Sequence, residues 1–209
     1  MDAINILLAI NLLSTFVMGV SVAKQGLKQK LSKVKEKPAS FLQSFPPNLA
    51  AVLILIFIIS FFGVGVFQTD SSFLQKLFSD SKVENTDLIL NLRAIGLVIY
   101  IIASWLQIKS IKDMGKFYSQ DVLVLNDHSI ISSGLFRYIR HPQYLFQILM
   151  DLGAGIALLS WIIIPLVVLV EFPLLILRAR MEERLLLKYY PENYQLYKKK
   201  TGFFIPFIG

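Results

Sequence analysis

Residues 143–177 read QYLFQILMDLGAGIALLSWIIIPLVVLVEFPLLIL, and this stretch decides the fold of the chain. It is 35 residues long, and only Asp151 and Glu171 interrupt its apolar character. One membrane-spanning helix needs about 20 residues, so the run is too long for one span, and two spans with a turn need about 40 or more. We therefore predict a tight hairpin of two short helices with its turn near residues 159–161. Pro165 is tolerated in the first turn of the returning helix.

Three further apolar runs precede the hairpin, and each is long enough to cross a bilayer as a helix. Residues 3–23 and 48–67 contain no charged side chain, and residues 88–108 contain only Arg93, whose stem can snorkel to the interface. No basic region precedes the first run, which favours a membrane helix over a signal peptide. The sequence thus predicts an all-α integral membrane protein with five transmembrane helices.

The composition supports this fold class and excludes several others. Of the 209 residues, 55% are apolar and only 17% are charged, with a mean hydropathy of +0.61. A soluble enzyme, a disordered chain and a secreted disulfide scaffold are excluded, because a soluble globule of this size cannot bury that much apolar surface. The absence of cysteine removes disulfides, thiolate nucleophiles, thiolate zinc sites and a prenylated C-terminus. With two histidines, a multi-histidine metal site is not expected.

The formal charge of +7 is better explained by membrane topology than by nucleic-acid binding. Residues 24–37 carry six lysines against one glutamate, whereas residues 68–87 carry two lysines against four acids. Residues 109–142 carry five basic side chains and residues 178–209 carry seven. The positive-inside rule then predicts an external N-terminus and a cytoplasmic C-terminus.

The loops and the C-terminal region have simpler local patterns. Residues 28–37 are interpreted as a solvated loop that faces lipid headgroups, and residues 121–133 as an extended segment followed by a polar turn. Residues 178–189 contain good helix formers throughout. Pro191 either stops this helix or starts the next turn, and residues 192–200 can continue as a second short helix.

The stretch 134–144, GLFRYIRHPQY, is the most informative polar cluster. Pro142 favours the first turn of a helix, whose free N–H groups attract a carboxylate or another electron-rich group. His141 lies beside this start, and Tyr144, three residues further on, shares its face. The alternative for the two arginines and the tyrosines is a simple anchoring role at the membrane interface.

A second constellation lies just beyond the hairpin. Arg178 and Glu182 are four residues apart and therefore share a helix face, either as an exposed ion pair or as a clamp for an anionic substrate and a carboxylate for a cofactor. Glu183 points elsewhere and could pair with Arg180 or with a loop cation. Ionisable groups at membrane depth are expensive, so the acids of the hairpin either line a pocket or are protonated packing groups.

Together these residues resemble the isoprenylcysteine carboxyl methyltransferase family, integral membrane methyltransferases related to phospholipid N-methyltransferases. The resemblance covers roughly residues 88–209 and rests on an ordered series of motifs. These are Leu92-Arg93-x-x-Gly96, Met114-Gly-Lys-Phe-Tyr118, His128-Ser-Ile-Ile-Ser-Ser-Gly134-Leu-Phe136-Arg-Tyr138, Arg140-His141-Pro142-x-Tyr144, Arg178-x-Arg180-x-Glu182-Glu183, Tyr194-x-x-Tyr197 and Gly202-Phe-Phe-Ile-Pro206.

The resemblance implies S-adenosyl-L-methionine as methyl donor, held on the cytoplasmic side by the loop after the third helix and the C-terminal helices. Arg178 would face the substrate. Cofactor contacts would come from His128, Ser129, Ile130, Ile131, Phe136, His141, Pro142, Gln143, Tyr144 and Glu182. A sulfonium cation fits such a set, since aromatic faces and carboxylates stabilise it. The family often has glycine two residues after the motif tyrosine, where this chain has Phe146.

The resulting expectation is a single membrane domain whose residues 1–87 supply two transmembrane helices and whose residues 88–209 form the catalytic core. It would methylate a lipophilic or lipidated acceptor that enters from membrane lipid, with the carboxyl group of an isoprenylcysteine-type substrate as the leading class. Lipid amines and small thiols are the alternatives. Two other classes are a non-catalytic membrane protein that retains the fold and a transporter that uses Asp151 and Glu171 as a proton relay. Nucleic acid is not an expected partner, and the sequence leaves the oligomeric state open.

Overall fold

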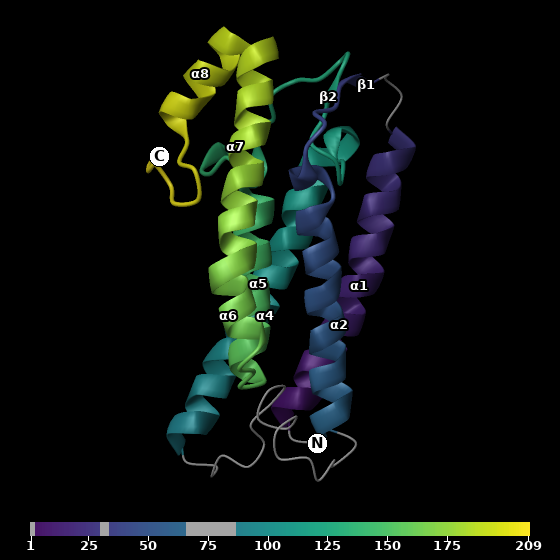
Figure 1. The fold of residues 1–209 in the computed structure, drawn as a ribbon, viewed down its shortest axis with the longest axis vertical. Coiled ribbons are helices and arrows are strands. Elements are labelled where there is room, and N and C mark those ends of the chain that lie inside the picture. Colours follow the sequence, from purple (N-terminus) through teal and green to yellow (C-terminus); the bar gives the residue numbers. More distant parts are fainter. Residues whose placement is uncertain (1–2, 30–33, 66–86) are drawn as a thin grey trace. The chain divides into compact units, whose positions relative to one another are not determined.

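The computed structural model describes residues 3–29, 34–65 and 87–209, and these are mostly helical (Figure 1). In chain order the elements are α1 (Ala3–Gln29), β1 (Val34–Glu36), the 3-10 turn η1 (Phe41–Gln43), α2 (Phe45–Gly65), α4 (Asp87–Met114), the 3-10 turns η2 (Gly115–Phe117) and η3 (Gly134–Arg137) on either side of β2 (Val124–Leu125), α5 (Pro142–Ala157), α6 (Ile163–Leu166), the π-turn η4 (Val167–Glu171), α7 (Phe172–Tyr189) and α8 (Pro191–Lys200).

The three long helices α1, α2 and α4 occupy the three predicted apolar runs. The segments long and apolar enough to cross a membrane are Ala3–Val22 in α1, Phe41–Phe61, which begins at η1 and continues in α2, and Asp87–Phe117, which comprises α4 and η2. Their exposed surfaces remain apolar, as at Leu13 and Phe16, which is typical of helices that face lipid. The last two residues of the second predicted run, 66–67, lie outside the described residues.

The predicted helical hairpin is confirmed as a fold element. Helix α5 ends at Ala157, and α6 begins at Ile163, so the turn falls around the predicted residues 159–161. Leu159 adopts a left-handed backbone conformation (φ 53°), and the Ser160 N–H then donates to the Gly155 carbonyl at 2.8 Å, which closes the end of α5.

The returning arm contains a π-turn that the sequence analysis does not predict. The turn η4 directly precedes α7, in which Pro173 is the second residue. Proline has no N–H for the carbonyl four residues earlier and its ring crowds that carbonyl, which accounts for irregular helical bonding at this place. Glu171, the last residue of the turn, is buried.

By its internal contacts the chain divides into two compact units. The first comprises Met1–Phe16, Asn48–Trp105 and Gln147–Pro173, and the second comprises Val17–Pro47, Leu106–Phe146 and Leu174–Gly209. Both units draw on the two halves of the sequence. These units do not test the predicted division into N-terminal helices, residues 1–87, and a catalytic core, residues 88–209, which stays a prediction.

In the first unit, close packing and a few polar bonds join the helices. Gly96 of α4 and Gly153 of α5 allow a close approach, because a Cβ on Gly153 would lie 2.6 Å from the Tyr100 backbone nitrogen. Arg93 Nε donates to the Ala157 carbonyl at 2.9 Å, so its charge lies at the C-terminal end of α5, where a cation is favourable. The sequence predicts that the Arg93 side chain extends to the membrane interface, and it does not predict this bond to the end of α5.

In the second unit a small antiparallel sheet supplements the helices. Strand β1 pairs with β2 in the register Val34 to Leu125 and Glu36 to Val124, and both β2 residues are buried. The all-α prediction is wrong for these strands, and the predicted loop 28–37 is wrong where it includes β1. The structure confirms the extended segment, the helix that ends at Tyr189 and the helix that starts at Pro191. Figure 1 shows α7 followed by α8 and the C-terminal tail, residues 201–209.

Candidate active site

The start of α5 positions two aromatic side chains as the sequence predicts. Pro142 is the first residue of the helix and is buried. The rings of His141 and Tyr144 stack with centroids 5.8 Å apart and planes 9° apart, which confirms that they share a face. Phe203 of the C-terminal tail also contacts the imidazole, with a centroid distance of 4.9 Å.

His141 lies between two carboxylates of α7. Its Nδ1 is 3.4 Å from Glu182 Oε2, and its Nε2 is 3.4 Å from Glu183 Oε1. Burial by itself lowers the pKa of His141, but the hydrogen bonds and charges of Glu182 and Glu183 outweigh it, so the pKa lies above its ordinary value of 6.5. The site therefore favours an imidazolium that donates from both ring nitrogens.

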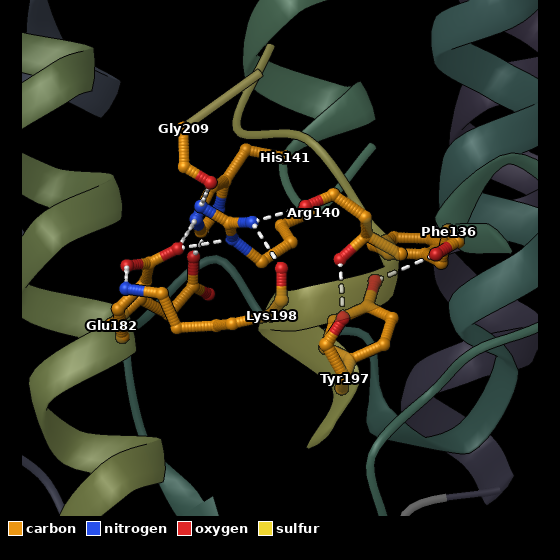
Figure 2. A network of polar contacts seen from close by, with 9 residues as sticks. Phe136, Arg140, His141, Glu182, Tyr197, Lys198 and Gly209 are labelled. Carbon is orange, nitrogen blue, oxygen red and sulfur yellow. Dashed lines mark hydrogen bonds and ion pairs between the residues drawn. The ribbon is translucent and has the colours of Figure 1, made fainter. Parts of the chain in front are cut away.

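Arg140 is the centre of a buried charged network, shown in Figure 2. Its Nε donates to Glu183 Oε1 at 2.6 Å, and its other nitrogens donate to the Thr201 carbonyl at 2.5 Å and the Gly209 carbonyl at 3.0 Å. Lys198 Nζ binds the second Glu183 oxygen at 2.8 Å. Although burial opposes ionisation, the hydrogen bonds of His141, Lys198 and Arg140 hold the pKa of Glu183 well below its usual range.

This network corrects one interpretation and decides another. Arg140 is only 4% exposed, so the interface-anchor alternative is wrong for it. That interpretation remains open for Arg137 and Tyr138, which are exposed. For Glu183 the sequence left two partners open, Arg180 and a loop cation; the loop cation is confirmed, and it is Arg140.

The same network fixes the C-terminal tail against the start of α5. The Arg140 N–H donates to the Gly202 carbonyl at 2.8 Å, and the Gly202 N–H donates to the Tyr138 carbonyl at 3.0 Å. A Cβ on Gly202 would collide with the Ile205 carbonyl, so only glycine fits this bend. The tail therefore forms part of the wall around His141.

Arg178 is buried, and each of the three nitrogens of its guanidinium donates at least one hydrogen bond. Its Nε donates to the Tyr144 hydroxyl at 3.1 Å, one terminal nitrogen donates to the carbonyls of Leu42 at 2.7 Å and Gln43 at 3.0 Å, and the other donates to the Gln120 carbonyl. The exposed ion pair with Glu182 is therefore wrong. Arg178 instead connects Tyr144 to two backbone segments of the second unit.

One of those segments was missed by the sequence analysis. The Gln43 side chain accepts from the Val122 N–H at 2.9 Å and donates to the Val122 carbonyl at 2.8 Å, so its amide pairs with the backbone as a strand would. The two residues are far apart in sequence, and nothing in the local pattern of residues 41–43 signals the contact. Only an observed pairing with the extended segment near Val122 could have found it.

His128 forms the second aromatic part of the site. Its ring lies 5.1 Å from that of Phe117 and 6.1 Å from that of Tyr190. Its buried Nδ1 has no hydrogen-bond partner among the described residues. Burial lowers the pKa of His128, although the charges of Glu182 and Asp127 act in the opposite direction.

The remaining predicted residues lie on the same unit. Ser129 is exposed, whereas Ile130, Ile131 and Gln143 are partly buried. Phe136 is buried, and its carbonyl accepts from the Tyr197 hydroxyl at 2.7 Å (Figure 2). Among the described residues there is no group of three or more side chains that could hold a metal ion.

The arrangement suits an organic zwitterion or cation. Glu182 is partly exposed, and its negative charge acts on both His141 and His128. Aromatic rings flank both of these imidazoles. Aromatic faces and a carboxylate favour a cation, and a buried imidazolium favours a carboxylate. The unpartnered His128 nitrogen adds one further hydrogen-bonding group.

Comparison with known proteins confirms the resemblance. Residues 94–188 match the model of the isoprenylcysteine carboxyl methyltransferase (ICMT) family. Relatives named protein-S-isoprenylcysteine O-methyltransferase occur in Saccharomyces cerevisiae, with 27% identity over 63% of this chain and 56% of the relative, and in Tribolium castaneum, with 29% identity over 54% and 41%. A solved structure of the eukaryotic intramembrane Ras methyltransferase ICMT matches with a TM-score of 0.57 and 26% identity, over 79% of this chain and 53% of that chain. The matches thus span about half the length of these proteins.

Proposed function

We propose that this chain is a membrane methyltransferase of the ICMT type, which transfers a methyl group from S-adenosyl-L-methionine to a lipophilic acceptor. The family match over residues 94–188 and the relatives' names support the reaction class. By this proposal the leading acceptor is the carboxyl group of an isoprenylcysteine-type substrate.

One observation of the site carries the donor assignment: Glu182 lies beside His141 and acts on His128, and aromatic rings flank both imidazoles. When bound, S-adenosyl-L-methionine supplies an activated methyl group on a sulfonium, together with an ammonium and a carboxylate. Glu182 would face the cationic groups, and the His141 imidazolium beside it would orient that carboxylate. The full proposed donor set is His128, Ser129, Ile130, Ile131, Phe136, His141, Pro142, Gln143, Tyr144 and Glu182.

Arg178 is proposed to position the acceptor side of the site. A carboxylate acceptor is already a nucleophile, so the protein contributes mainly orientation and exclusion of water. The contacts of Arg178 with Tyr144 and with the carbonyls of Leu42 and Gln43 support such a positioning role, because they fix the Tyr144 hydroxyl relative to residues 42–43.

Phe146 favours a second acceptor class. It is buried, and it stands where the family often has a glycine. A phenylalanine side chain fills space that a glycine would leave free. A small thiol or a lipid amine is therefore the second candidate, and either would need a general base. Of His141 and Glu182, Glu182 suits that role better, because the site favours His141 in its protonated form.

The proposed membrane architecture has five spans. Helix α5 and the arm from α6 to Leu177 of α7 would form the last two membrane helices as a tight hairpin, with the site and the C-terminus in the cytoplasm. Reporter fusions after Lys37, Lys116 and Gly209 should read cytoplasmic, and one near Ser79 should read external. An external C-terminus would separate the site from its donor and contradict the proposal.

Isothermal titration of the purified full chain with S-adenosyl-L-methionine, followed by a screen of acceptors with a tritiated methyl donor, tests the function. Glu182→Gln should lose donor affinity about ten- to a hundredfold, the equivalent of roughly 1.5–3 kcal/mol for a hydrogen bond to a charged group. Arg178→Ala should lower turnover more than donor affinity, and Arg178→Lys should recover part of it. The exposed Arg137→Gln serves as the control.

Three outcomes would count against this scheme. Absence of donor binding by the wild-type chain would overturn the proposed reaction. Equal loss of donor affinity in the Glu182 and Arg178 variants would mean that their roles are misassigned. Normal turnover in both would place this part of α7 outside the site.

A further inference from the structure

Helix α7 has an exposed face that the proposed reaction does not use. Leu177, Arg180, Arg184 and Lys188 follow one another at steps of three or four residues and therefore share this face. Leu177 is 45% exposed, and the two arginines are also exposed. The opposite face carries Arg178, Glu182 and Glu183 toward the site.

The two arginines on this face have no counter-charge within the described part of the chain. Lys188, one turn further on, has one: its Nζ lies 2.5 Å from Glu36 Oε2. Arg180 and Arg184 form neither a hydrogen bond nor an ion pair with a described residue, and the acids next to them in sequence, Glu182 and Glu183, are bound to His141 and to the Arg140 network.

This pair carries a charge that cannot be relieved by titration. Guanidinium groups do not deprotonate in proteins, so Arg180 and Arg184 remain two like charges on adjacent turns of one helix. Like charges at this spacing destabilise a helix. An anionic group lying across both would remove this repulsion.

The position of the pair along α7 indicates where that anion would lie. With a rise of about 1.5 Å per residue, Arg180 is about 4.5 Å and Arg184 about 10.5 Å beyond the exposed apolar Leu177 along the helix axis. The headgroup layer on each side of a bilayer is roughly 5–8 Å thick. If Leu177 contacts acyl chains, the Arg180 backbone lies within this layer and the Arg184 backbone just beyond it. Helical side chains tilt toward the N-terminus, so the long Arg184 side chain can reach back to the level of the lipid phosphates.

We propose that Arg180 and Arg184 form a binding site for the headgroup of an anionic phospholipid, with Leu177 against its acyl chains. The inference rests on the proposed placement of the hairpin in the bilayer. Guanidinium groups bind phosphate oxygens with two parallel hydrogen bonds, and a basic pair next to an exposed leucine is complementary to a phosphate next to a hydrocarbon chain.

Lipid binding by the full chain tests the site without methyl donor or acceptor, so its failure is distinct from failure of the proposed reaction. Wild type, the double variant Arg180→Gln/Arg184→Gln and the matched control Lys199→Gln/Lys200→Gln would each be placed in nanodiscs containing phosphatidylglycerol and phosphatidylcholine. Native mass spectrometry then gives the ratio of retained lipids. The control removes two other exposed cations, from α8.

Wild type should retain phosphatidylglycerol selectively, and the double variant should lose about 25-fold of that preference, on the order of fivefold for each basic residue at a membrane surface. The control should keep the wild-type ratio. An unchanged ratio in the double variant, or an equal loss in the control, would overturn the site.

Two further arms test the nature of the ligand. Glycerol phosphate or an acidic peptide that displaces the lipid at equal concentration would indicate a general anion site or a protein partner, and either result would overturn the lipid assignment. Because the chain has no cysteine, Leu177→Cys provides a unique label. A water-soluble maleimide should not modify it in nanodiscs; full modification would place Leu177 in water and reject the proposal.

Discussion

Glu183 and Glu171 are both buried carboxyl groups of the second half of the chain, but their surroundings differ. Glu183, in the second unit, accepts hydrogen bonds from Arg140 at 2.6 Å and Lys198 at 2.8 Å and lies 3.4 Å from His141. Glu171, in the first unit, accepts from the neutral amide of Gln147 at 3.1 Å and lies beside Asp151. Within the described residues, neither Glu171 nor Asp151 forms an ion pair with a basic side chain.

The difference indicates how each unit stabilises polar groups. The second unit surrounds its carboxylate with fixed positive charges, so removal of one partner leaves the others buried and uncompensated. The first unit uses amide and hydroxyl groups, as in the bond from Asn11 to Ser104 at 2.9 Å, and among its described residues no charged network surrounds Asp151 and Glu171. Substitution of a buried charged residue should therefore lower the stability strongly in the second unit and only slightly in the first.

The largest effect is expected for Arg140→Gln. The change leaves Glu183 without its main counter-charge and frees the carbonyls of Thr201 and Gly209, so the free energy of unfolding should fall by about 3–5 kcal/mol. Thermal unfolding in detergent measures this. The exposed Arg137→Gln should stay within about 0.5 kcal/mol of wild type.

A paired substitution sharpens this result. Replacing both partners, as in Arg140→Met/Glu183→Leu, should recover part of the loss, because no buried charge is left uncompensated. Wild-type stability of Arg140→Gln alone would show that the network does not hold the tail.

The next largest effect concerns donor binding in the second unit. His141→Ala and Tyr144→Phe should each weaken S-adenosyl-L-methionine binding about ten- to a hundredfold, because the first removes the imidazolium that orients Glu182 and the second removes a hydroxyl group of the site. Titration calorimetry measures the affinity, and circular dichroism checks that the variants remain folded. Unchanged affinity in both variants would reject this site.

The two histidines should respond to pH in opposite directions. The pKa of His141 is raised above 6.5, so its contribution to stability is complete below pH 6.5 and is lost as pH rises through the folded-state pKa. The pKa of His128 is lowered, so its contribution is present above pH 6.5 and declines as pH falls below it. Thermal midpoints from pH 5 to 9 should lose the alkaline slope in His141→Gln and the acid slope in His128→Gln. Parallel changes in both variants would contradict these assignments.

How much of this could be predicted from sequence depends on the range of the contacts. The apolar runs, the turn near Leu159 and the shared face of His141 and Tyr144 follow from length, helical period and proline position, all of which are local. The sheet between β1 and β2 and the pairing of Gln43 with Val122 join residues about 80 apart or more, and no local pattern encodes such partners. For the same reason the sequence identified Arg178 as a site residue but did not predict its contacts with Leu42 and Gln43.

The smallest effect is expected in the first unit, for Asp151→Asn. Asparagine has nearly the same shape, and since no described cation pairs with Asp151, the substitution removes no ion pair; the change in stability should stay below about 1 kcal/mol. Gln147→Leu should cost more, about 1–3 kcal/mol, because it leaves the Glu171 carboxyl without its amide donor. Both follow from thermal unfolding in the same detergent as Arg140→Gln. A loss for Asp151→Asn as large as that for Arg140→Gln would mean that a charge at position 151 is compensated, and the contrast between the two buried acids would then disappear.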